Sequence, residues 1–133
     1  MRQLAFVLLL IASPAAADAK PPISGLYGDL TYNDEGGDLL GTEIRIVKSA
    51  EHYEAYVQTA EGTPGPVRRA AVTASGNHVH FTVAEKDGSH DEYDGRITSG
   101  GFDGTRTSVS PSRMVASPLR LPRLKKSYWQ RAH

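Results

Sequence analysis

The sequence predicts an all-β protein, a small antiparallel up-and-down β-barrel of about eight strands, and three observations support this. Glycine-rich and other turn-forming clusters divide residues 33–101 into short pieces. The segments between the clusters are rich in Val, Ile, Tyr, Thr and Phe. Several of them alternate apolar and polar residues with a period of two, as half-buried strands do. Sequential short strands of this kind favour a barrel, and about eight strands close around a side-chain core or one small ligand.

Residues 1–19 predict a cleavable signal peptide ahead of the barrel. Arg2 supplies a basic start, an uncharged apolar run covers residues 4–12, and small residues follow it. The apolar run is too short for a membrane-spanning helix, which needs about 20 residues. Cleavage is expected after Ala17 or Ala19. We therefore expect a periplasmic or secreted protein whose mature chain has no transmembrane segment.

The barrel domain is expected to cover residues 20–122, followed by a basic aromatic tail at 123–133. The first strands are expected at 23–32, 38–48 and 52–60, and residues 67–109 are expected to form a four-stranded meander. The alternation fades between residues 104 and 118, and a last strand is expected near residues 119–121.

The register of the meander follows if the inward side chains of neighbouring strands share one face. A three-residue loop at 86–88 pairs Phe81 with Tyr93, whereas a two-residue turn would place an aspartate opposite Phe81. The longer loop also puts a glycine where a left-handed conformation is needed. The same rule pairs residues across the two neighbouring hairpins, Ala74 with Val79 and Ile97 with Phe102.

Three short motifs accompany this strand pattern: Gly25-Leu26-Tyr27, Tyr93-Asp94-Gly95 and Phe102-Asp103-Gly104. With about eight short strands, they resemble the small calycin-like barrels of the lipocalin and avidin type. The Gly-x-Trp signature of lipocalins is absent, and Trp129 is the only tryptophan of the chain. The resemblance implies a β-barrel.

Aromatic residues at inward positions are the candidate ligand-binding residues. Glycines among them would leave space, and tyrosines would offer polar tips to a ligand. We expect a small apolar or amphipathic ligand inside the barrel, in contact with Tyr27, Tyr53, Phe81, Tyr93 and Phe102.

Two histidines form a candidate metal site. His78 and His80 lie two residues apart on a predicted strand, so they share a face, and the register places Asp94 opposite His80. Two imidazoles and a carboxylate could hold zinc or copper. The alternative is a solvated sheet surface with a cross-strand histidine–aspartate pair.

Charge is unevenly distributed along a formally neutral chain. Residues 18–103 hold all 15 acids and 7 bases, whereas residues 104–133 hold 7 bases and no acid. The basic tail either neutralises its own acidic body or contacts an anionic partner, and export argues against nucleic acid. Trp129 could plug the barrel or belong to a disordered tail. Alternatively, the tail contacts a partner through Arg123, Lys125, Lys126, Tyr128 and Trp129.

Catalytic motifs are missing from the sequence. The chain has no cysteine, no Gly-x-Ser-x-Gly elbow and no phosphate-binding glycine motif. We therefore expect no enzyme and no cofactor. The sequence favours a binding protein for a small ligand. The alternative is an interaction or inhibitor module that contacts an exported protein or the cell envelope through its surface and its tail.

Overall fold

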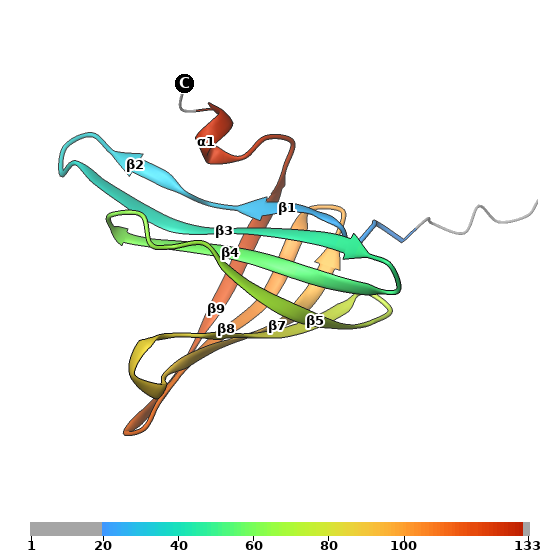
Figure 1. Cartoon of the computed structure of the whole chain (residues 1–133). Coiled ribbons are helices and arrows are strands. Elements are labelled where there is room, and N and C mark those ends of the chain that lie inside the picture. The colour runs from blue at the N-terminus through green and yellow to red at the C-terminus, as the bar shows by residue number, and fades with distance from the viewer. Residues whose placement is uncertain (1–19, 132–133) are drawn as a thin grey trace, which may run out of the picture.

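The computed structural model describes residues 20–131, so the predicted signal peptide at 1–19 lies outside the described residues. Strands dominate the described chain, with one 3-10 turn at Lys86–Gly88 and one short helix (Figure 1). The elements are β1 (Gly25–Gly28), β2 (Thr31–Asn33), β3 (Asp38–Ser49), β4 (His52–Gly62), β5 (Arg68–Ser75), β6 (His78–Ala84), β7 (His90–Thr98), β8 (Gly101–Ser110), β9 (Arg113–Leu124) and α1 (Tyr128–Arg131).

The strands form one antiparallel sheet in the order β1-β9-β8-β7-β6-β5-β4-β3-β2. A second pairing of β1 with β3, in which Gly25 lies opposite Ile46, closes the sheet on itself. Strand β2 follows β1 along the same edge of β3, with Thr31 opposite Leu40. The fold is therefore a closed eight-stranded antiparallel barrel with one extra strand, which confirms the predicted fold class.

The predicted register of the meander is also confirmed. Phe81 lies opposite Tyr93, and their rings stack with centroids 4.9 Å apart. In the connecting turn Asp87 and Gly88 have φ values of 64° and 71°, so two successive residues take the left-handed conformation. The neighbouring pairs follow as expected, Ala74 with Val79 and Ile97 with Phe102.

The first predicted strand, 23–32, is divided into β1 and β2. The backbone N–H of Asp29 donates to the carbonyl oxygen of Thr42 at 2.9 Å. Its side-chain Oδ1 accepts from the backbone N–H of Thr42 at 2.7 Å. Because a side chain replaces one ladder acceptor here, regular pairing stops at Asp29 and resumes at Thr31.

The last strand is much longer than the predicted 119–121. Strands β8 and β9 pair continuously from Gly101 opposite Pro122 to Ser110 opposite Arg113. Residues 113–118 are all exposed. The alternation fades in this region of the sequence because this part of β9 buries neither face. Strand β9 also extends to Leu124, so the first residues of the basic tail belong to the barrel wall.

The barrel interior is filled by a single cluster of apolar side chains. The largest side chains in it that are almost completely buried are Tyr27, Tyr93, Phe81, Phe102, Ile44, Ile46, Ile97 and Leu121. All come from alternating positions on their strands, as one face of a pleated sheet requires.

The chain entering β1 covers one end of the barrel, which we call the closed end. The Tyr27 hydroxyl donates to the carbonyl oxygen of Ile23 at 2.7 Å, and Ile23 packs against the core. From the last strand, Arg123 Nη2 donates to the carbonyl oxygen of Pro22 at 2.8 Å. The pKa of Tyr27 is raised by burial, an effect that the neighbouring Arg123 cation partly offsets.

The residues after β9 pack on the outside of the wall, where Figure 1 shows α1 beside β1 and β2. A small second cluster joins Tyr128 to Leu30, Leu39 and Ala60. Glu43 accepts hydrogen bonds there from Ser127 Oγ at 2.5 Å and from the backbone N–H of Tyr128 at 2.9 Å. The tail is therefore attached to β3 by both apolar and polar contacts.

Candidate functional site

The end of the barrel opposite the closed end, which we call the open end, has polar side chains at inward positions. Asp91 lies two residues from Tyr93 on β7, and Arg106 lies opposite Tyr93 on β8. Glu85 follows the core residue Val83 at the same spacing. Because side chains two apart on a strand share a face, these charged groups continue the inner surface of the barrel.

These groups surround a hollow of about 380 Å³ at the open end. We call this hollow the charged cup. Its lining comes from β4, from the loop that follows it, from the residue after β6, and from β7 and β8: Thr59, Glu61, Thr63, Gly65, Glu85, Asp91 and Arg106.

Two ion pairs organise the cup. Arg106 Nη2 lies 2.8 Å from Asp91 Oδ2, and the side chain of Asp91 is only 7% exposed. Arg68 Nε lies 3.3 Å from Glu85 Oε2, with both side chains about one third exposed. The Asp91 carboxylate is thus shielded from water, whereas the Arg106 side chain is 25% exposed. Loss of Arg106 would therefore leave a buried negative charge uncompensated.

Arg106 also connects the cup with the core below it. Its guanidinium carbon lies 6.0 Å from the centre of the Tyr93 ring. Burial raises the pKa of Tyr93 to about 12, so its hydroxyl stays protonated at neutral pH. Among the described residues, the buried Arg106 Nε has no hydrogen-bond partner. A ligand oxygen that reached this atom would satisfy it.

Carboxylates outnumber cations in the cup. Among the described residues, the three carboxylates Glu61, Glu85 and Asp91 lie with two cations, Arg106 of the lining and the neighbouring Arg68. Within residues 20–131, Glu61 forms no ion pair, and it is exposed. Thr59 and Thr63 add hydroxyl groups to this lining. The cup therefore suits a molecule that carries positive charge together with hydroxyl groups.

The aromatic residues expected to bind a ligand lie mostly inside the packed core. Tyr27, Phe81, Tyr93 and Phe102 are each no more than 2% exposed and belong to the interior cluster. Tyr53 is partly buried against that cluster, with Lys48 Nζ 5.8 Å from its ring centre. The structure brings the first four together, but they pack against one another and against aliphatic side chains.

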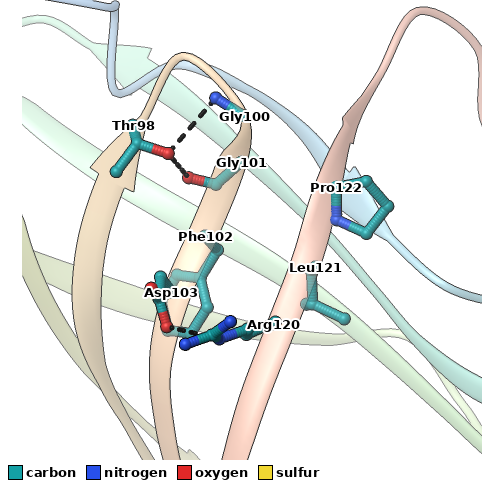
Figure 2. Close-up of a pocket in the computed structure, with 8 residues that line it drawn as sticks. All are labelled: Thr98, Gly100, Gly101, Phe102, Asp103, Arg120, Leu121 and Pro122. Carbon is teal, nitrogen blue, oxygen red and sulfur yellow. Dashed lines mark hydrogen bonds and ion pairs between the residues drawn. The ribbon is translucent and has the colours of Figure 1, made fainter.

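Of these aromatic residues, Phe102 also borders a hollow of about 300 Å³ beside the β7–β8 turn, which Figure 2 shows in close-up. The Thr98 hydroxyl closes this turn by donating to the Gly101 carbonyl oxygen at 3.3 Å. Arg120 Nε lies 3.3 Å from Asp103 Oδ1 across the neighbouring strands. The polar groups drawn in Figure 2 thus bond with one another, so this hollow is a weaker candidate than the cup.

The three candidate metal ligands do meet, on the outside of the barrel. His78 Nε2 lies 2.9 Å from Asp94 Oδ1, and His80 Nδ1 lies 3.0 Å from Asp94 Oδ2. Both hydrogen bonds lower the pKa of Asp94, and the bond with His78 has the larger effect. In the described part of the chain, no group of three or more His, Cys, Asp or Glu side chains is arranged to hold a metal ion. The geometry matches the alternative, a histidine–aspartate pair extended to a second histidine.

The tail residues expected to contact a partner fall into two groups. Arg123 points into the closed end, where it holds the entering chain, whereas Lys125 and Lys126 are exposed. Trp129 Nε1 donates to Gln58 Oε1 at 2.7 Å. Because Val57, the neighbour of Gln58, points into the core, Gln58 lies on the outer face, and Trp129 does not plug the barrel.

A second hollow, the tail groove, lies between this tail and the β2–β3 hairpin. It measures about 290 Å³ and is lined by Tyr32, Gly37, Leu39, Gly62, Thr63, Pro64, Tyr128 and Trp129. Tyr32 is 50% exposed and Trp129 is 38% exposed. Thr63 lines both this groove and the charged cup, so the two hollows lie on either side of the β4–β5 loop.

The residues of the charged cup were not predicted from the sequence. A signal was present, because Asp91 and Glu85 stand at the inward positions next to Tyr93 and Val83. A carboxylate at an inward position of a strand whose other inward residues are apolar indicates the end of a barrel or a polar site. Its cation partner, Arg106, lies in the region where the alternation fades.

No helix among the described residues has the length and apolar character needed to span a membrane. Comparison with protein-family models, curated proteins and solved structures found no significant match to this chain.

Proposed function

We propose that this chain is an exported binding protein of calycin-like architecture that takes a small hydroxylated amine at the open end of its barrel. The observation that carries this proposal is the charged cup, in which Glu61 faces the solvent without an ion pair among the described residues. The closed end is covered by the entering chain, which leaves the open end for a ligand.

The proposed ligand differs from the apolar or amphipathic molecule that the sequence favoured. The inward aromatic positions support a packed core, whereas the hollow above them is lined by carboxylates, threonines and Arg106. An amine would pair with Glu61, and a ligand hydroxyl oxygen could accept from Arg106 Nε. Amino sugars combine these two groups in one small ring.

The test is a thermal-shift and calorimetric screen of the exported protein with glucosamine, glucose, a diamine, sulfate and a fatty acid. The proposal expects glucosamine to raise the melting temperature and to bind more tightly than glucose. Stabilisation by the fatty acid alone would point to the interior, and no stabilisation by any compound would refute the proposal.

Glu61→Gln is the variant that tests the site itself. It removes one charge from the rim of the cup without disturbing the Arg106–Asp91 pair, so the fold should be unaffected. Glucosamine binding should weaken about ten-fold, as expected for the loss of one charge-assisted hydrogen bond. Glu51→Gln, at the exposed β3–β4 turn near the other end of the barrel, is the matched control.

A second candidate function is an interaction or inhibitor module, and the tail groove is the observation that favours it. Large aromatic side chains with half-exposed surfaces are typical of protein contacts. Deleting the tail would also remove Tyr128 from its cluster with Leu39, so point changes are the better test. Trp129→Ala and Tyr32→Ala should abolish capture of an exported partner while glucosamine binding is unchanged. Glu61→Gln, by contrast, should weaken glucosamine binding and leave capture of the partner unchanged.

A further inference from the structure

The outer edge of β9 lacks a strand partner over most of its length. Strand β9 pairs with β8 from Arg113 to Pro122, but with β1 only through Arg123 and Leu124. The rest of that edge faces no other strand among the described residues. Figure 1 shows the β8–β9 hairpin leaving the barrel on the side away from β2 and β3.

The backbone groups on this edge can be identified from one hydrogen bond. The backbone N–H of Arg123 donates to the carbonyl oxygen of Gly100, toward β8. The β8–β9 pairing has no break, so odd-numbered residues of β9 bond with β8 and even-numbered residues point away from it. The free edge therefore offers donors at Met114, Ala116 and Arg120, and acceptors at the same residues and at Pro118.

Prolines occupy two of the outward positions, Pro118 and Pro122. A proline at an outward position of an edge strand has no backbone N–H to offer to another strand. It therefore limits non-specific pairing of the edge with other chains. It also leaves Met114 and Ala116 as neighbouring donors on an uninterrupted stretch. Met114 is 72% exposed and Val115 is 40% exposed, so the edge is flanked by apolar surface.

The charge around the edge restricts what can pair with it. Arginines stand near both ends of the stretch, at Arg113 and Arg120, and residues 104–133 contain no acid. Asp103 on β8 pairs with Arg120, whereas Arg113 has no ion pair within the described residues. A second copy added antiparallel would place two basic stretches side by side, because the charged residues of 113–124 are all arginines, and this is unfavourable. An acidic strand would be attracted instead.

We infer that the β9 edge from Met114 to Arg120 is a docking site for an extended acidic peptide segment, which adds to the barrel as an antiparallel strand. Main-chain hydrogen bonds to Met114, Ala116 and the carbonyl oxygen of Pro118 bind the segment. Its acidic ends lie beside Arg113 and Arg120. This site is separate from the charged cup and does not depend on the ligand proposed there.

The probe is a fluorescent eight-residue peptide of alternating valine and threonine with glutamate at both ends. Anisotropy should show saturable binding that weakens with added salt, and a version with lysine at both ends should bind at least about ten-fold more weakly. Amide hydrogen exchange by NMR should slow at Met114 and Ala116 when the peptide is added. An N-methylated peptide with the same side chains should not bind.

Ala116→Pro is the decisive variant. Because Pro118 and Pro122 already occupy the same side of β9, the strand accommodates a proline there without loss of a β8 bond. Circular dichroism should be unchanged and peptide affinity should fall at least about ten-fold, whereas Ala116→Val keeps the N–H and should bind as the parent does. No binding at millimolar peptide, equal binding by the Ala116→Pro variant, or concentration-dependent dimerisation through β9 would each overturn the inference.

Discussion

The guanidinium of Arg123 lies over the ring of Tyr27, with its central carbon 4.9 Å from the ring centre. This contact joins the last strand of the barrel to the first, at the point where Arg123 also pairs with Tyr27 through the backbone. Arg123 Nη2 also holds the Pro22 carbonyl oxygen, so one side chain fixes the chain that covers the closed end. Beside the strand pairing, a cation–π contact and a hydrogen bond to the entering chain therefore join the two ends of the barrel sheet.

Replacing this arginine should destabilise the whole barrel. Arg123→Ala removes the cation–π contact and the hydrogen bonds to the entering chain, and should lower the free energy of unfolding by roughly 2–3 kcal/mol. Urea denaturation measures the difference. Arg113→Ala, at the exposed tip of the β8–β9 hairpin, should change it by less than about 0.5 kcal/mol. Equal effects of the two changes would contradict the role of the closed end.

The carboxylate of Glu43 is expected to hold the tail on the outer wall. It is 8% exposed and accepts from Ser127 Oγ and from the backbone N–H of Tyr128. Glu43→Gln loses one of these acceptors and should destabilise tail packing by about 1–2 kcal/mol. Trp129 fluorescence should shift to the red and become more accessible to iodide. An unchanged spectrum would mean that the apolar contacts of Tyr128 are enough to hold the tail on the wall without Glu43.

Gly104 lies opposite Gly95 in the β7–β8 pair, where the two backbones approach closely. A Cβ at Gly104 would clash with the carbonyl oxygen of Asp94 and the Cα of Gly95. Gly104→Ala should therefore lower stability by about 2 kcal/mol or more, because backbone must move to accept it. Thermal melts of the two variants measure the difference. Gly100→Ala, whose Cβ would meet the Thr98 hydroxyl at 3.7 Å, should leave the stability nearly unchanged.

Acid should weaken the hydrogen-bonded group around Asp94. Its pKa is lowered in the folded protein, chiefly by the hydrogen bond with His78. A carboxyl whose folded pKa is depressed stabilises the fold above its unfolded pKa of about 3.9, and this contribution is lost as the pH falls through the folded pKa. The side chain is half exposed, so the contribution should be below about 1 kcal/mol.

Urea denaturation between pH 2 and pH 7 should detect this contribution. The difference in stability between the parent and Asp94→Asn should be present at neutral pH and should vanish below about pH 3. Asp34→Asn, in the exposed β2–β3 turn, serves as the comparison, and its stability should equal that of the parent at every pH. A difference that persists unchanged in acid would show that Asp94 acts through shape rather than through charge.

Binding of glucosamine should depend on the Arg106–Asp91 pair as a unit. Asp91→Asn leaves the partly buried Arg106 cation without its counter-charge, so the protein should lose about 2 kcal/mol of stability as well as its ligand. The double variant Asp91→Asn with Arg106→Gln should recover much of that stability without recovering binding. Recovery of binding in the double variant would show that the cup ligand does not use this pair.

Local patterning was sufficient to predict the barrel and much of its register. Phe81 opposite Tyr93 follows from alternation and from a loop length, because both residues and the turn between them lie within a short stretch of chain. The pairing of Ile97 with Phe102 follows in the same way. The charged cup was missed because its members come from distant strands, and a single inward carboxylate does not reveal its partner.

The sequence by itself determined an all-β chain with sequential hairpins, since period-two alternation and turn residues act locally along the backbone. Only the tertiary structure decided how the two ends of the chain are used. The hydrogen bond from Ser127 to Glu43 spans 84 positions, and that from Arg123 to Pro22 spans 101. No local periodicity encodes such contacts, because they form only after closure brings β9 beside β1. The same closure leaves the rest of the β9 edge without a partner, which the sequence could not show.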